Sequence, residues 1–288
     1  MSATEGAILF FGEYMEIHDL VRKAIAGDKC ALEGVVSSIQ DDIYYLALRM
    51  LANPDDAKDA TQEILIKVIT KLSTFQFKSQ FKTWVFRVAS NYLITEKKII
   101  NKDPGLTFDM YKVDLESDLL NPDDLKNSPE YQLMLNELRI SCTMAMLLCL
   151  DLSHRMAYIL GDIFEMEHKQ ASEILSISKA NFRQQLSRAR SKVVEFTSNS
   201  CGVVNSCARC SCEKKLTGAI NRQRIKPGCI NLANNTETSY VKVKELVNET
   251  QTSLRTLALH QSIDHYKCPI ELGEVIESLV FSGLNPQY

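Results

Sequence analysis

Apolar residues recur at helical spacing through most of the chain. From Ile17 to about Met50 two such patterns follow each other, and Gly27-Asp28 interrupts the first. Asn53-Pro54 predicts the next helix start, because asparagine caps a helix and proline suits its first position. We expect that helix to run to about Leu72, with its apolar residues on one side.

A second set of helical patterns begins near residue 130. It predicts helices over 130–150, 155–164 and 168–175. A tight turn at Ser176 and a helix cap at Ser178 lead into one more helix with a basic outer face. This arrangement is typical of a helix-turn-helix, whose second helix lies in the major groove of DNA. The alternative is an ordinary helical hairpin with a solvated basic face. The predicted buried stripe of the last helix is Phe182, Leu186, Ala189 and Val193.

The stretch 101–129 is rich in proline and acidic residues, and it predicts an acidic linker with little regular structure. Beyond residue 198 we expect two further helices, over 241–265 and 270–280. The fold class is therefore all-α: two small helical domains joined by an acidic linker, plus a helical C-terminal extension. The expected organisation is an N-terminal tail (1–16), a first domain (17–100), the linker (101–129), a helix-turn-helix domain (130–197) and the C-terminal extension (198–288).

The helix expected over 54–72 carries a polar patch opposite its apolar stripe. Asp59, Gln62 and Glu63 project to that side, with Ile66 and Thr70 beside them. Such an acidic and amide face is either plain solvent surface or a docking face for a basic partner.

Residues 75–98 combine aromatic rings with cations and contain no acid before Glu96. Bases stack on aromatic rings while Lys and Arg hold phosphates, so this composition suits a nucleic-acid strand. The alternative is that the aromatics are core residues and the lysines a solvated edge. On a helix, one face would carry Phe81, Val85, Val88 and Tyr92, and a neighbouring face would carry Trp84, Arg87, Asn91 and Lys98.

The composition is that of a folded protein: 288 residues, 45% hydrophobic and 24% charged. The net charge is −3, but the window 168–192 is basic and 101–151 is acidic, and local sign matters most for steering a polyanion. The apolar runs are too short to span a bilayer and no secretory signal is evident, so we expect no membrane insertion and a cytoplasmic location. There is no phosphate-cradling glycine loop and no recognisable histidine–nucleophile spacing, so the sequence shows no constellation for hydrolysis or nucleotide binding.

Two blocks of sequence resemble a known family. The run from Asp56 to Glu63, followed by Phe75 to Asn91 with Phe81-Lys82-Thr83-Trp84 inside it, resembles region 2 of bacterial sigma factors. The run from Leu152 to Lys192 resembles region 4. Both occur in the right order, separated by the acidic linker and without a region 3 domain, which is similar to the extracytoplasmic-function (ECF) type of sigma factor.

The resemblance implies a non-enzymatic factor that binds core RNA polymerase and promoter DNA, and an anti-sigma protein as a further partner. It implies that Asp59, Gln62, Glu63 and Ile66 bind the polymerase. It assigns recognition and opening of the −10 element to Phe75, Phe77, Lys78, Trp84, Arg87, Asn91, Lys97 and Lys98. It assigns the −35 element to Lys179, Asn181, Arg183, Gln184, Ser187 and Arg188.

The sequence departs from the family pattern at three positions. Phe77 and Ser176 stand where the family often has glycine, and Gln185 stands where a basic residue is usual. The promoter sequence is therefore not carried over from relatives.

Four cysteines lie close together after the second domain, at Cys201, Cys207, Cys210 and Cys212. Cys201-Gly202-Val203-Val204-Asn205 followed by a CxC pair resembles a motif found after region 4 in some ECF-type relatives. Four thiols allow a tetrahedral Zn site or a redox sensor, although the spacing is not that of a zinc ribbon, and reduced structural thiols are the alternative. No cofactor is otherwise expected.

Two other functions compete with the sigma-factor reading. One is a helix-turn-helix regulator that binds promoter DNA without polymerase, which leaves the Asp59 face and the Trp84 face unused. The other is a cysteine-rich metal- or redox-sensing interaction protein. The extension itself is a candidate for regulating the factor from within.

Overall fold

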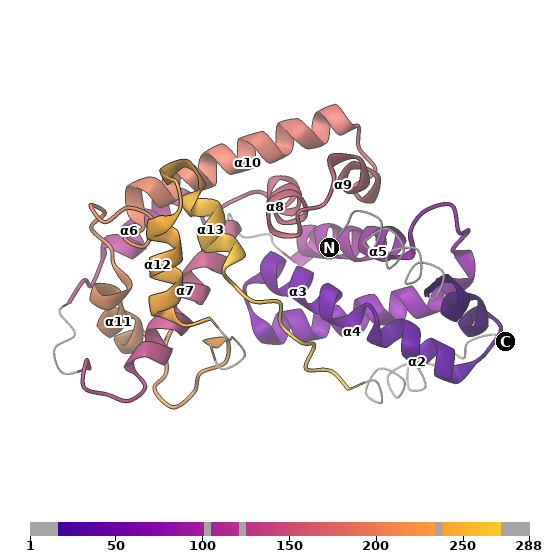
Figure 1. Cartoon of the computed structure of the whole chain (residues 1–288), viewed down its shortest axis with the longest axis horizontal. Coiled ribbons are helices and arrows are strands. Elements are labelled where there is room, and N and C mark those ends of the chain that lie inside the picture. Colours follow the sequence, from indigo (N-terminus) through magenta and orange to yellow (C-terminus); the bar gives the residue numbers. More distant parts are fainter. Residues whose placement is uncertain (1–16, 101–104, 121–124, 234–237, 272–288) are drawn as a thin grey trace.

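The computed structural model describes residues 17–100, 105–120, 125–233 and 238–271. Within these ranges the protein is built from helices, with two isolated β-bridges and no strand. Figure 1 shows two groups of helices side by side, with the C-terminal extension lying against the second group and reaching across to the first. The all-α fold predicted from the sequence is confirmed.

The first group of helices follows the predicted order. Residues 17–25 are helical, and α2 (Lys29–Ser37), α3 (Gln40–Leu51), α4 (Pro54–Thr70) and α5 (Phe81–Ile100) follow. The Asn53 side chain accepts hydrogen bonds from the backbone N–H groups of Asp55 (2.9 Å) and Asp56 (3.3 Å), and Pro54 occupies the first turn. The cap predicted at Asn53 is therefore confirmed. We call this group the first module.

The second group holds the helix-turn-helix. It comprises α7 (Tyr131–Leu148), α8 (Leu152–Tyr158), a π-helical turn at Ile159–Ile163, α9 (His168–Ile174) and α10 (Lys179–Ser200). Asp151 caps α8, and the Ser178 hydroxyl accepts the Asn181 N–H at 3.1 Å to cap α10. Ser176 forms the turn between α9 and α10 with φ +54°. We call this group the second module.

The expected irregular linker is wrong for residues 108–116, which form α6 (Phe108–Glu116). Thr107 caps this helix by accepting the Met110 N–H at 3.2 Å. Tyr111 and Leu115 are four residues apart, share one face and are buried. Tyr111 stacks on Phe196 of α10 with 5.6 Å between the ring centroids. The helix is stabilised because Tyr111 packs on a residue of α10 that lies more than 80 residues further along the chain.

The C-terminal extension contains α11 (Cys212–Asn221), α12 (Tyr240–Glu249) and α13 (Arg255–Gln261). The sequence pattern missed α11. The single helix expected over 241–265 is wrong, because the chain breaks at Thr250 and restarts after a 3-10 turn. Arg255 stabilises the break by donating to the carbonyls of Thr250 (3.2 Å) and Asn248 (3.1 Å). The helix expected over 270–280 lies outside the described residues from 272 onward.

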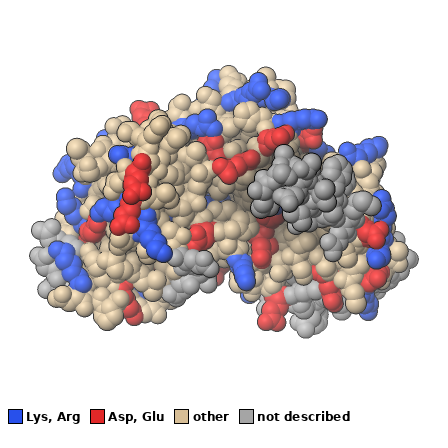
Figure 2. Space-filling view, in the orientation of Figure 1, with Lys and Arg blue, Asp and Glu red and all other residues tan. Residues whose placement is uncertain are grey.

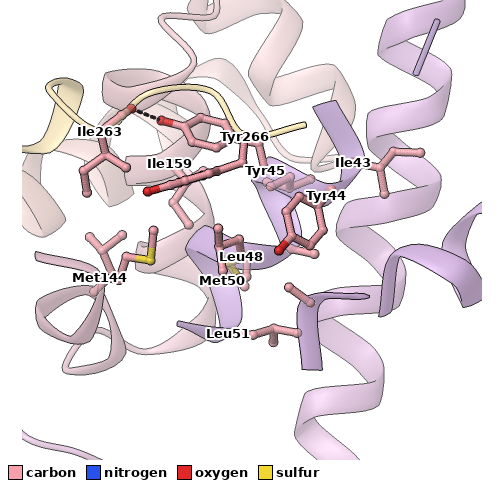
Figure 3. Packing of buried hydrophobic residues seen from close by; sticks show 14 of the residues in the cluster. Ile43, Tyr44, Tyr45, Leu48, Met50, Leu51, Met144, Ile159, Ile263 and Tyr266 are labelled. Carbon is pink, nitrogen blue, oxygen red and sulfur yellow. Dashed lines mark hydrogen bonds between the residues drawn. The ribbon is translucent and has the colours of Figure 1, made fainter. Parts of the chain in front are cut away.

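A strap, residues 262–270, runs from α13 across α3 of the first module. The Tyr45 hydroxyl donates to the Ile263 carbonyl at 3.0 Å, and the Cys268 N–H donates to Asp41 Oδ1 at 2.8 Å. Figure 3 shows Tyr45, Ile263 and Tyr266 gathered at this contact, near Met144 of α7. Both modules and the extension thus share one continuous buried core.

No helix in the described part of the chain is long and apolar enough to cross a membrane.

Candidate nucleic-acid and protein interfaces

The outer face of α10 presents the residues predicted for the −35 element. Phe182, Leu186, Ala189 and Val193 are buried on its inner face, as predicted. Figure 2 shows Lys and Arg side chains along the upper edge of the molecule, over α10. All six predicted residues are exposed: Lys179, Asn181, Arg183, Gln184, Ser187 and Arg188.

Arg190 lies on the same helix but has a structural partner. Its guanidinium donates to both carboxylate oxygens of Asp162, at 2.9 and 2.5 Å, and the Asp162 side chain is 5% exposed. The hydrogen bonds that Arg190 donates to Asp162 raise the pKa of Arg190, and this bidentate pair connects α10 to the π-helical turn. Arg190 is therefore exposed, but its guanidinium is already paired with Asp162.

The aromatic residues of the first module are less open than predicted. Phe75 is 4% exposed and belongs to the core, so the expectation that its ring meets DNA is corrected. Trp84 is half-buried, and its ring stacks on Phe81 with 5.9 Å between centroids. Phe77 is also half-buried, with the Arg22 guanidinium 5.0 Å from its ring centroid.

The cations and amides of the −10 set are more accessible than the rings. Lys78 and Asn91 are exposed. α5 continues to Ile100, but the side chains of Lys97 and Lys98 lie outside the described set.

A groove of about 260 Å³ lies between the end of α4 and the middle of α5. Arg87 and Asn91 line it, as the sequence suggested for a DNA surface, together with Lys67, Lys71 and Tyr92, which the sequence reasoning missed. Lys67 Nζ lies 5.4 Å from the Tyr92 ring centroid. The sequence could have indicated Lys67 and Lys71, because two lysines four residues apart at the end of a helix lie on the same face. The full lining is Lys67, Lys71, Arg87, Val88, Asn91, Tyr92 and Thr95.

Arg87 also joins the two modules. It donates to the Glu173 carbonyl at the end of α9 from Nε (3.1 Å) and from an Nη (2.8 Å). Gln170 of α9 donates to the Thr83 hydroxyl at 3.2 Å. A residue predicted for the −10 surface is thus engaged by the helix-turn-helix of the same chain.

The predicted protein-docking face lies on α4. Asp59 and Glu63 are exposed, while Gln62 and Ile66 are half-buried, and Ile66 packs against the core. The face is therefore an acidic surface with an apolar margin, as the sequence indicated.

The cysteines form a cluster that sequence spacing only partly anticipated. Cys201 pairs with Cys210 through a backbone bridge, and the Gly202 N–H donates to the Cys210 carbonyl at 2.9 Å. Cys210 and Cys212 are buried, whereas Cys207 is exposed. Burial raises the pKa of the Cys210 thiol to about 12, which favours an unreactive thiol. Among the described residues, no group of three or more His, Cys, Asp or Glu side chains is placed to hold a metal ion.

A helical module with a basic groove, joined by a linker to a helix-turn-helix, defines a two-module DNA-binding protein. The Sigma-70 region 2 family matches residues 35–98, and the Sigma-70, region 4 family matches residues 140–193. The chain therefore belongs to the sigma-70 family, and its relatives place it among the ECF-type sigma factors.

Two curated relatives align with this chain over most of their own length. The ECF RNA polymerase sigma factor SigW of Bacillus subtilis is 27% identical over 178 residues, which is 61% of this chain and 94% of SigW. The ECF RNA polymerase sigma-E factor of Haemophilus influenzae is 27% identical over 60% of this chain and 91% of its own. Among solved structures, CnrH in complex with the cytosolic domain of CnrY matches with 19% identity and a TM-score of 0.42, over 60% of this chain and 91% of that one. Neither family match extends beyond residue 193.

Proposed function

We propose that this chain is a non-catalytic initiation factor of the cytoplasm that carries core RNA polymerase to promoters. The observation that supports this most is that both sigma-70 matches occur in one chain, in order, on two separate helical modules. A regulator that works without polymerase needs only the helix-turn-helix and gives the first module no role.

The −35 element is proposed to bind α10 in the major groove. The exposed face of α10 offers Arg, Lys, Asn and Gln, the side chains that pair with guanine and adenine edges or with phosphates. Phe182 and Leu186 on the buried face fix the direction of that surface relative to α9. Arg183 and Arg188 are the strongest candidates for base or phosphate contact, because no carboxylate among the described residues pairs with them.

The −10 element is proposed to engage the groove between α4 and α5. Lys67 and Lys71 suit phosphates, Asn91 suits a base edge, and the Tyr92 ring offers a stacking surface. Stacking contributes about 1–3 kcal/mol per base, which is comparable with the few kcal/mol needed to unstack one. Trp84 is half-buried and stacked on Phe81, so only the accessible part of its ring contributes.

The polymerase is proposed to bind the α4 face. The double substitution Asp59→Lys, Glu63→Lys reverses the charge of that face without touching the α10 surface. We expect it to weaken binding to core polymerase by at least about tenfold, or about 1.4 kcal/mol, since like-charge contact at an interface costs that much or more. A pull-down with core polymerase and a titration measure this.

The matched control is Glu33→Lys, an exposed acid on α2 outside the face. It should leave the affinity unchanged. If the unmodified chain binds promoter duplex but never retains core polymerase, the helix-turn-helix regulator becomes the better account.

An anti-sigma partner and a zinc site stay predictions. Metal analysis of protein purified under reducing conditions tests the zinc site, with serine at Cys201, Cys207, Cys210 and Cys212 as the comparison. Cys142 of α7 packs against the same cluster as Cys201 and Cys210 and therefore belongs in that experiment.

A further inference from the structure

The acidic linker is bound by the C-terminal extension. Asp114 of α6 accepts hydrogen bonds from Arg222 at 2.8 Å and from Arg224 at 2.5 Å. The Lys215 side chain is 3% exposed, and its ammonium lies 3.9 Å from the Asp114 carboxylate. The ammonium donates to the backbone carbonyls of Asp114 and Ser117. Burial raises the pKa of Asp114, but Arg224, Lys215 and Arg222 together bring it below its usual value. The carboxylate is therefore charged and held by three cations.

The contact continues along the chain after α6. Arg222 pairs with Asp118, Arg209 lies 3.7 Å from Glu116, and the Leu120 N–H donates to the Lys214 carbonyl at 2.9 Å. Two of these contacts pair an acid of the linker with a base of the extension, and the third joins the two backbones. The acidic linker predicted from the sequence thus lies against basic residues of the extension.

Gly218 of α11 makes this close approach possible. A Cβ atom at this position would lie 2.6 Å from the Asp118 carbonyl oxygen and 2.8 Å from its Cβ. Glycine inside a helix costs about 1 kcal/mol relative to alanine, so α11 carries a local penalty where the linker backbone rests on it. Figure 1 shows α6 beside the C-terminal end of α10, and Tyr111 adds its stacking contact with Phe196 there.

We propose that Lys215, Arg222, Arg224 and Gly218 form a binding site for the linker helix α6, and that its occupation keeps the two DNA-binding modules too close to reach both promoter elements. This inference rests on the proposed function. We call the site the linker seat.

The length of the free tether decides the argument. Between the end of α5 at Ile100 and the start of α7 at Tyr131 the chain has 30 residues. Fully extended they reach about 100 Å, at roughly 3.4 Å per residue. With α6 in its seat, only residues 101–107 still separate the first module from the rest, and they reach about 24 Å.

The promoter demands more than the short tether allows. The −10 and −35 elements lie about 25 base pairs apart, or roughly 85 Å at about 3.4 Å per base pair. Each module has a radius of about 15 Å, so the short tether allows a distance of at most roughly 55 Å between the centres of the two modules. With the whole linker free, the centres of the two modules can lie roughly 130 Å apart. Release of α6 is therefore necessary for simultaneous contact with both elements.

The structure is in the short-tether arrangement. Arg87 bonds the Glu173 carbonyl, and the strap fastens the extension to α3. The site that binds α6 and the contacts between the modules thus both favour the arrangement in which the two modules are close together.

The test uses the full-length chain with two kinds of variant. Arg222→Ala, Arg224→Ala removes the charges, and Gly218→Ala fills the seat while it raises the helix propensity of α11. Lys226→Ala and Asp109→Asn are the matched controls, since both side chains are exposed and, among the described residues, neither pairs across the seat. The first readout is hydrogen exchange of the amides in 108–120. The second is run-off transcription with core polymerase on a promoter that carries both elements.

We expect exchange in 108–120 to accelerate at least about tenfold in both seat variants and in neither control. We expect transcription to rise about fivefold in the same two variants, because a larger fraction of the chain can span the promoter. Unchanged exchange overturns the linker seat. Faster exchange with transcription unchanged or lower overturns the constraint on reach. If neither the unmodified chain nor any variant binds core polymerase, the proposed function fails, while the exchange data still decide whether the extension holds α6.

Discussion

Among the described residues, six other than glycine occupy a backbone region that usually belongs to glycine, and Phe77 and Ser176 are two of them. Phe77 has φ +56° and Ser176 has φ +54°, and these are the positions where the sequence departs from the glycine of its family. The left-handed conformation brings Cβ close to the following carbonyl oxygen, which costs roughly 1–2 kcal/mol for an ordinary residue. The turn geometry of the helix-turn-helix is thus kept by a serine at some expense of stability.

Ser176→Gly tests this. We expect the free energy of unfolding to rise by about 1 kcal/mol, because glycine adopts positive φ without the Cβ clash. Urea denaturation of the full chain measures the change. The control is Ser191→Gly, in the exposed middle of α10, where the same substitution should lower stability by about 0.5 kcal/mol because glycine is a poor helix former. Equal signs for the two variants would contradict the assignment of strain to Ser176.

Local signals at single residues were enough to predict several helix ends. The caps at Asn53 and Ser178 were both legible from the sequence, because a capping side chain bonds backbone groups only two or three residues away. The burial of Phe75 was not predictable in this way. Its ring packs against Phe77 and Phe81 in a cluster that forms only once the loop before α5 takes its shape.

At the scale of elements, α10 is the helix whose cap and burial pattern the sequence predicted best. Its buried stripe, its cap and its six exposed polar residues all agree with the prediction. α6 shows the opposite case, because Tyr111 and Leu115 are buried against residues of other helices that lie further along the chain, such as Met146 of α7 and Phe196 of α10. Periodicity over nine residues flanked by prolines and acids cannot reveal such a partner.

Arg188 and Arg190 of α10 separate a DNA-binding role from a structural one. We expect Arg188→Ala to weaken −35 duplex binding and to reduce the slope of log K against log salt by about 1, because one phosphate contact is lost. Arg190→Ala should instead lower the stability of the second module, since Asp162 is then buried without its partner. Fluorescence anisotropy of the polymerase-bound chain over a salt series, with thermal unfolding of each variant, distinguishes them. An unchanged slope in Arg188→Ala would place that side chain away from the DNA backbone.

At the scale of the whole molecule, the two modules and the extension meet in a core with an unusual share of polar groups. Arg49 and His260 are fully buried, and Arg49 donates to Tyr45 (2.6 Å) and to the His260 carbonyl (2.9 Å). Both ring nitrogens of His260 and two guanidinium nitrogens of Arg49 have no hydrogen-bond partner among the described residues. Burial, with the Arg49 charge, lowers the pKa of His260 to about 3, so the ring is neutral. Each buried polar group left without a hydrogen bond lowers the stability of this contact between the modules by about 1–3 kcal/mol.

Sequence reasoning gave the two modules but not this meeting point. Tyr45 and Arg49 lie on α3, while their partners come from residues 260–266, more than 200 positions later. The extension has no match in either family description, so its contacts could come only from the structure. The apolar packing of the strap stabilises the contact between the modules, whereas the buried polar groups without hydrogen bonds destabilise it. The difference between these two free energies determines how easily the modules separate.

Tyr266→Ala shifts that balance toward opening. Tyr266 is 3% exposed and packs beside Tyr45, with 6.5 Å between ring centroids. We expect the substitution to lower the free energy of unfolding by about 3 kcal/mol, as for other large buried side chains, and yet to raise transcription with core polymerase. The comparison is Val68→Ala, which removes buried apolar atoms inside the first module and should lower stability without the gain in transcription. Calorimetry and run-off transcription on the same preparations measure both quantities. Because a merely damaged protein loses activity with stability, opposite changes in the two point to a strap that restrains the modules, and a parallel loss in Tyr266→Ala contradicts it.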